Sequence, residues 1–224
     1  MNSTHNVPLY RYELINSVLP MFGPNPKYLE IGVFDPAGCF DLIQTENKDS
    51  VDPGVEWEVN PVKYKLTSDE FFLRLDNGTL DKPHNYLWDV IFIDGLHLAP
   101  QVEKDIHNAL RHLNPKGFIF LHDCNPPDIH MAREDYYVNG EQQLWNGTTW
   151  KAFFKARATN PYIDTCVVNT DWGVGVIRFG ANNSEVNIED NPFFEYNVMA
   201  ENRTRHLGLI SPSHWYNWLN SRNA

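Results

Sequence analysis

Apolar runs alternate with amphipathic segments along most of the chain. The clearest apolar run covers 88–94, and the segment 98–113 after it repeats its apolar residues at helical spacing. Short apolar runs between turn-forming residues are typical of strands that are buried on both faces of a parallel sheet. Further strands are predicted at 28–33, 50–52, 62–66 and 118–121, and further helices at 7–19, 37–43 and 69–75.

This alternation predicts the α/β fold class, because successive parallel strands need crossover helices. We expect a doubly wound, mostly parallel, seven-stranded Rossmann-like sheet. Two β-rich runs at 163–168 and 172–179 predict a C-terminal antiparallel hairpin that closes the sheet. The length of 224 residues indicates a single domain, 1–224. Within it we expect a helical lead-in at 1–25, a lid-like insertion at 124–160 and a C-terminal tail at 181–224.

Composition narrows the choice of partners. The chain has 29 acidic and 18 basic residues, a net charge of −11, which disfavours nucleic acid. It has no bilayer-spanning apolar run and no N-terminal signal pattern, and its 3 cysteines form no CxxC pair. We therefore expect a cytoplasmic protein with no membrane or nucleic-acid partner. The aromatic tail at 215–218 predicts either packing on the domain or a contact in a homo-oligomer.

Polar residues, most of them acidic, follow the predicted strands. Ligands of open α/β sheets bind beyond the carboxyl ends of the strands, where these residues would meet. An acid after the second strand can accept hydrogen bonds from a ribose diol, and a glycine lets the backbone approach a ligand closely. The pattern indicates a nucleoside site. Its residues are Glu30, Gly32, Asp52, Ser68, Asp69, Asp94, His97, His122 and Asp123.

Segments 29–33, 51–54, 67–72, 92–97 and 113–123 together resemble class I S-adenosylmethionine-dependent methyltransferases. The likeness is to small O-methyltransferases of sugar and natural-product pathways. It implies that S-adenosyl-L-methionine is the cofactor. In that resemblance Glu30 and Gly32 line the methionine end, Asp52 holds the ribose hydroxyls, Ser68 and Asp69 lie near the adenine, and Asp94 faces the sulfonium.

The loop after the first strand departs from the family, because five residues separate Gly32 from Gly38 where a GxGxG-like pattern is common. A dinucleotide pyrophosphate needs closer backbone approach than this methyl donor does. The departure therefore weakens a dehydrogenase interpretation more than a methyltransferase one.

The segment Asp94-Gly95-Leu96-His97 carries the predicted chemistry. In similar metal-dependent sugar O-methyltransferases the acid binds magnesium, the histidine takes the hydroxyl proton, and two later acids complete the metal shell. The resemblance thus assigns catalysis to Asp94 and His97, and a divalent ion such as magnesium or manganese to Asp94, His122 and Asp123. A histidine in place of an acid favours manganese, iron or zinc over magnesium.

The predicted function is methyl transfer from S-adenosylmethionine to an oxygen of a small polar acceptor, such as a sugar or glycan-like compound. A histidine with an ordinary pKa near 6.5 suits the removal of the hydroxyl proton. Two alternatives stay open. One is a metal-dependent hydrolase or oxygenase that uses Asp94, His97, His122 and Asp123, and the other is a nucleoside-sensing module without turnover.

Overall fold

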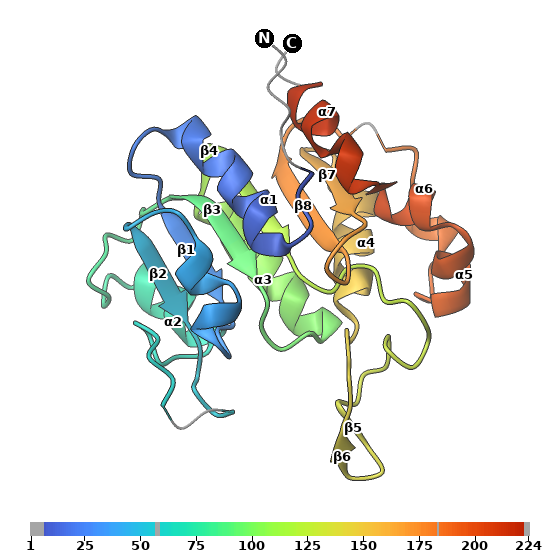
Figure 1. The fold of residues 1–224 in the computed structure, drawn as a ribbon, viewed down its shortest axis with the longest axis horizontal. Coiled ribbons are helices and arrows are strands. Elements are labelled where there is room, and N and C mark those ends of the chain that lie inside the picture. Colours follow the sequence, from blue (N-terminus) through green and yellow to red (C-terminus); the bar gives the residue numbers. More distant parts are fainter. Residues whose placement is uncertain (1–6, 57–58, 183, 222–224) are drawn as a thin grey trace.

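The computed structural model describes residues 7–56, 59–182 and 184–221, and these form a seven-stranded sheet with helices on both faces (Figure 1). The strand order is β2-β1-β3-β4-β8-β7-β9. A separate two-stranded ribbon, β5-β6, extends away from the sheet. The strands are β1 (Tyr28–Ile31), β2 (Lys48–Val51), β3 (Trp88–Ile93), β4 (Leu113–Leu121), β5 (Tyr137–Val138), β6 (Glu141–Gln142), β7 (Ile163–Val168), β8 (Val174–Phe179) and β9 (Leu209–Ile210).

The sheet is mostly parallel, as the sequence predicts. β2, β1, β3 and β4 pair in parallel, β8 runs antiparallel between β4 and β7, and β7 pairs in parallel with β9. The predicted hairpin is thus confirmed. It does not close the sheet, however, because β9 from the C-terminal tail forms the outer edge.

Each central strand buries both of its faces. In β3, Ile91 and Ile93 belong to one apolar cluster, whereas Val90 and Phe92 belong to the other. This alternation follows from the twofold repeat of a strand. Helices α2, α3 and α4 contribute to the first cluster, and α1 and α7 to the second. The helices are α1 (Arg11–Val18), α2 (Ser68–Asp76), α3 (Ala99–Arg111), α4 (Thr149–Thr159), α5 (Tyr196–Glu201), α6 (Arg203–Leu207) and α7 (Trp215–Asn220).

Three local predictions were wrong. Residues 36–38 and 40–42 form two short 3-10 turns instead of an α-helix over 37–43, because the backbone at Cys39 leaves the helical region between them. Residues 62–66 form no strand, and only Tyr64 makes an isolated parallel bridge to Val51. The strand predicted at 118–121 begins earlier, at Leu113, because β4 accommodates the Pro and Gly of 114–117 at an irregularity in its pairing with β3.

The insertion after β4 is shorter than predicted. Residues 149–159 form α4, whose Trp150, Phe153 and Phe154 are buried in the core. The lid-like part is therefore limited to 125–148, which we call the insertion below. In the tail, Trp215 is fully buried and donates a hydrogen bond to Ser17, so this part packs on the domain. Within the described residues, no helix combines the length and the apolar composition needed to cross a bilayer.

Candidate functional site

Two adjoining cavities lie at the carboxyl ends of the parallel strands. The larger has a volume of about 650 Å³ and the smaller about 320 Å³. The residues that line both are Gly32, Phe34, Glu56, Asp94 and Gly95. A ligand that occupied both cavities would therefore pass the tips of β1 and β3.

The smaller cavity collects the residues predicted for the nucleoside. Asp52, Ser68 and Asp69 line it together with apolar side chains from the neighbouring strands and loops. Thr67 caps α2 by accepting a hydrogen bond from the Glu70 amide, which fixes the start of the helix beside the cavity. Asp69 pairs with Lys104 at 2.8 Å, and hydrogen bonds from Lys104 and Gln101 lower its pKa.

Asp52 is held by the loops around it. Its carboxylate accepts hydrogen bonds from the amides of Val33 at 3.0 Å and Gly54 at 2.6 Å, and from the side chain of Asn60 at 3.1 Å. These contacts tie the loop after β1 to the loop after β2. The ribose-binding role of Asp52 stays a prediction, and its position in the smaller cavity is compatible with that role.

Glu30 lines the larger cavity but is only 3% exposed. Burial raises its pKa to about 8, and the nearby Asp94 adds to the rise, while a hydrogen bond from the Tyr28 hydroxyl opposes it. Glu30 is therefore mostly a neutral carboxylic acid near pH 7. The sequence marked it as an acid but could not reveal this protonation state.

Gly32 also makes room for a close contact within the protein. A Cβ atom at this position would lie 2.2 Å from the backbone oxygen of Asp94, and the residue has a φ of 87°. The missing side chain makes room for the tip of β3. The backbone that lies close to Gly32 is therefore that of Asp94, although Gly32 also lines both cavities.

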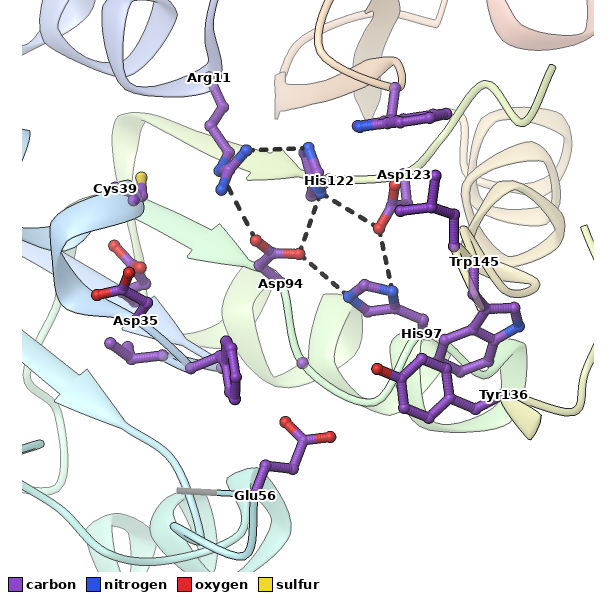
Figure 2. Close-up of a pocket in the computed structure, with 18 of the residues that line it drawn as sticks. Arg11, Asp35, Cys39, Glu56, Asp94, His97, His122, Asp123, Tyr136 and Trp145 are labelled. Carbon is purple, nitrogen blue, oxygen red and sulfur yellow. Dashed lines mark hydrogen bonds and ion pairs between the residues drawn. The ribbon is translucent and has the colours of Figure 1, made fainter. Parts of the chain in front are cut away.

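The larger cavity contains a compact ionic cluster (Figure 2). Asp94 Oδ1 lies 3.1 Å from His97 Nε2 and 3.2 Å from His122 Nδ1. Asp123 Oδ2 lies 3.0 Å from His97 Nδ1 and 3.2 Å from His122 Nδ1. The two carboxylates and two imidazoles therefore form a closed ring, which brings together all four residues predicted for catalysis or metal binding.

The carboxylates and imidazoles of this cluster stabilise each other's charged forms. Burial lowers the pKa of His97 and of His122, but the neighbouring carboxylates, Asp94 above all, outweigh it, so both pKa values are raised. Burial raises the pKa of Asp94, but His122 and His97 hold it well below its ordinary value. The cluster therefore favours the protonated imidazoles and the ionised Asp94 more strongly than water does.

Two further residues complete the cluster, and the sequence analysis missed both. Arg11 Nη1 lies 3.0 Å from Asp171 Oδ2, and Arg11 Nε lies 3.8 Å from Asp94 Oδ2. Asp171 Oδ1 lies 3.4 Å from His122 Nε2. Asp171 follows β7, which is parallel to the central strands, so the strand-tip rule applied to β7 would have found it. Arg11 precedes the first strand and carries no comparable signal.

The backbone around the cluster is strained. Four residues without a glycine's freedom adopt a positive φ there, at 45° to 63°. Such conformations are costly for residues with side chains, and they persist where surrounding contacts enforce them, often at functional sites. The four are His97, Asp123, Asp171 and Trp172.

The end of the insertion is joined to the turn that carries His97. Trp145 stacks on the His97 ring with centroids 5.4 Å apart, and the Thr148 amide donates to the His97 carbonyl at 2.7 Å. The Thr148 hydroxyl accepts a hydrogen bond from the Ala99 amide at 2.8 Å, at the start of α3. Asn146 donates to Asp123. This part of the insertion is therefore a fixed wall of the site.

The cluster also offers metal ligands. Among the described residues, one ligand atom each from Asp94, His97 and Asp123 lie within 4.8 Å of one another. Two carboxylates and an imidazole suit manganese, iron or zinc better than magnesium. The group includes His97 in addition to the predicted Asp94 and Asp123. His122 is not part of it, although its Nδ1 atom lies 3.2 Å from an oxygen of each of the two carboxylates. The ligand set of Asp94, His122 and Asp123 stays a prediction.

Comparison with known families supports the predicted class of protein. Residues 39–124 match the sequence pattern of a family described as a methyltransferase domain. This part of the chain is therefore similar to a methyltransferase domain. The match spans β2, α2, β3, α3 and β4, and ends just after Asp123. It confirms the methyltransferase resemblance and gives no support to a hydrolase or oxygenase. No curated protein matches the chain significantly.

Solved structures give similar folds at low identity. An O-methyltransferase from Bacillus cereus, solved with S-adenosylhomocysteine, is 15% identical with a TM-score of 0.48, over 78% of this chain and 81% of that one. The methyltransferase PaMTH1 from Podospora anserina is 17% identical with a TM-score of 0.48, over 75% and 76%. An O-methyltransferase described as hypothetical from Klebsiella pneumoniae is 16% identical with a TM-score of 0.48, over 80% and 83%.

Proposed function

We propose that the protein transfers a methyl group from S-adenosylmethionine to a hydroxyl oxygen of a small polar acceptor, such as a sugar or glycan-like compound. The observation that carries this proposal is the junction of the two cavities at Gly32 and Asp94, with His97 on the side of the larger cavity. The smaller cavity offers apolar walls and Asp52 for an adenosyl group. The larger has room for the methionine end and the acceptor.

S-Adenosylmethionine supplies a methyl group on a positively charged sulfur; the acceptor oxygen forms the new bond to this carbon, and the carbon–sulfur bond breaks with its electron pair on sulfur. His97 receives the hydroxyl proton. Asp94 forms a hydrogen bond with Nε2 of His97, Asp123 lies 3.0 Å from Nδ1 as an ion pair, and Trp145 stacks on the ring. Because the carboxylates raise the pKa of His97, we expect the rate to rise with pH through a pKa above 6.5.

A divalent ion held by Asp94, His97 or His122 and Asp123 would supply a Lewis acid that lowers the pKa of the acceptor hydroxyl. The same donor atoms are paired with each other in this structure. An ion would therefore compete with histidine protons for the carboxylates.

The experiment is calorimetry followed by a transfer assay. We expect S-adenosylhomocysteine to bind with a micromolar dissociation constant, and a labelled methyl donor to transfer label to hydroxylated small molecules, sugars first. A panel of simple sugars, glycosides and phenols separates the acceptor classes. Tight binding of a divalent ion without any affinity for the nucleoside would overturn the proposal.

A further inference from the structure

Arg11 lies outside the matched methyltransferase domain and yet lines the larger cavity. It comes from α1, which precedes the first strand in the chain, and its guanidinium lies near Asp94, on the side of the cavity that Cys39 lines (Figure 2). Among the described residues that line the two cavities, it is the only lysine or arginine. Its charge is therefore the one permanent cation available to a bound anion.

The contacts of Arg11 leave one edge of the guanidinium free of hydrogen bonds. Nη1 donates to both oxygens of Asp171, at 3.2 and 3.0 Å, and the Arg11 backbone amide donates to the same carboxylate at 2.9 Å. Nε is buried and has no hydrogen-bond partner. Its nearest carboxylate oxygen, on Asp94, is 3.8 Å away, which is an ion pair without a hydrogen bond.

The Nη2 atom of Arg11 lies beside the loop after β1. A Cβ atom built on Gly38 would lie 3.7 Å from Nη2, and no described residue accepts a hydrogen bond from that nitrogen. The Nε and Nη2 edge of a guanidinium is a planar pair of donors that matches the two oxygens of a carboxylate. Asp171 thus holds the group in place by one nitrogen, while among the described residues Nε and Nη2 donate no hydrogen bond.

We infer that Arg11 binds the carboxylate of the methyl donor's amino-acid end. This inference rests on the proposed function, because it assumes that S-adenosylmethionine occupies the two cavities. Asp35, Glu56, Asp94 and Asp123 also line the larger cavity and would repel an anion. Arg11 offsets that repulsion and gives the cofactor a fixed partner from a helix that the domain match does not include.

The test compares ligands that differ only in this carboxylate. The probes are S-adenosylhomocysteine and its decarboxylated aminopropyl analogue, and binding to the whole protein is measured by calorimetry. The wild type should prefer S-adenosylhomocysteine by roughly 10- to 100-fold, the range of a charge-assisted pair of hydrogen bonds. Arg11→Met should lose most of this preference while its affinity for the analogue stays within about 3-fold, the spread of measured interaction values.

Two more variants keep the test sharp. Arg11→Lys keeps the charge without the planar fork and should retain part of the preference. Thr170→Val removes the hydrogen bond from Thr170 to the Leu9 carbonyl, so it loosens the attachment of the segment before α1 without touching the guanidinium. It should keep the wild-type preference.

Several outcomes would overturn the inference. If Arg11→Met weakens both ligands equally, or weakens neither, the residue does not recognise the carboxylate, while the proposed function stands. If Thr170→Val loses the preference as Arg11→Met does, docking of the N-terminal segment explains the effect. If the wild type binds neither nucleoside, the proposed function fails as well.

Discussion

The two cavities are built in different ways. In the smaller one, Asp52 is held mainly by backbone amides from the loops after β1 and β2. In the larger one, Asp94, His97, His122 and Asp123 are held by one another, and Arg11 and Asp171 complete the network. Asp52 in the smaller cavity is thus positioned mainly by backbone amides, whereas the ionisable groups of the larger cavity are positioned by other side chains.

The difference predicts how each cavity responds to mutation. Loss of an acid from the smaller cavity should affect binding most, because that acid presents acceptor atoms to a ligand. Loss of one member of the ionic network should affect chemistry most, because the network sets the protonation and position of His97. Four substitutions test this contrast.

The largest effect is expected for His97→Ala. Removal of the base should lower the transfer rate by about 10²- to 10⁴-fold, the usual contribution of general base catalysis. Affinity for S-adenosylhomocysteine should change little, because Asp52 and the smaller cavity are intact. Steady-state kinetics and calorimetry measure the two quantities.

His107→Ala is the matched control, since His107 is exposed on α3 and lines neither cavity. It should behave as the wild type. A fully active His97→Ala protein would show that another group takes the proton.

The next effect is expected for Asp52→Ala. Loss of this acceptor should weaken S-adenosylhomocysteine binding by about 10- to 100-fold, because hydrogen bonds to a charged group contribute about 1.5–3 kcal/mol. Asp41→Ala, at an exposed acid outside both cavities, is the control. Unchanged affinity in Asp52→Ala would contradict the assignment of the ribose to the smaller cavity.

Gly147→Ala tests the fixed wall of the larger cavity. A Cβ at Gly147 would lie 2.3 Å from the His97 carbonyl oxygen, and the residue has a φ of 66°. We expect a loss of about 2–3 kcal/mol in the free energy of unfolding, from overpacking and backbone strain, together with slower transfer. Chemical denaturation and kinetics measure both.

Gly140→Ala separates the two causes. Gly140 has a φ of 83° but no atom within 4 Å of a built Cβ, so this variant has the strain without the clash. It should lose about 1 kcal/mol and keep its rate. Equal losses in the two variants would mean that the insertion is not fixed against His97.

Glu30→Gln tests the neutral acid behind the network. The folded pKa of Glu30 is raised by burial to about 8 from 4.5, so the folded state binds a proton that the unfolded state releases. Its contribution to stability is complete below pH 4.5 and is lost as pH rises toward 8. The variant should therefore gain stability relative to the wild type over this interval, by at most about 1.4 kcal/mol per pH unit.

Denaturation series at several pH values measure this gain, and Glu46→Gln, at an exposed acid, is the control. A difference between Glu30→Gln and wild type that does not vary with pH would mean that Glu30 is ionised in the folded protein.

Much of the fold could be predicted from the sequence. The strands that became β1, β3, β7 and β8 are marked by apolar runs, and α3 by its periodic apolar face. The errors at 37–43 and 62–66 concern short segments, where local preference is weak and neighbouring contacts decide. β9 has two residues and pairs with β7 from the far end of the chain, so no local pattern could have revealed it.

The residues of the site were also predicted only in part. Acids and histidines at strand tips were found because parallel strands bring their carboxyl ends to one edge, a consequence of chain direction alone. Arg11 was missed because α1 reaches that edge only by packing on the other face of the sheet.

The sequence by itself determined the strand and helix alternation, the acidic composition and the set of residues at the strand tips, because these depend on local periodicity and side-chain chemistry. Only the tertiary structure decided that Glu30 is neutral, that His97 and His122 share two carboxylates, and that Arg11 and Asp171 join them. The physical reason is that a pKa and an ion pair depend on burial and on distances between residues far apart in the chain, and these exist only after folding.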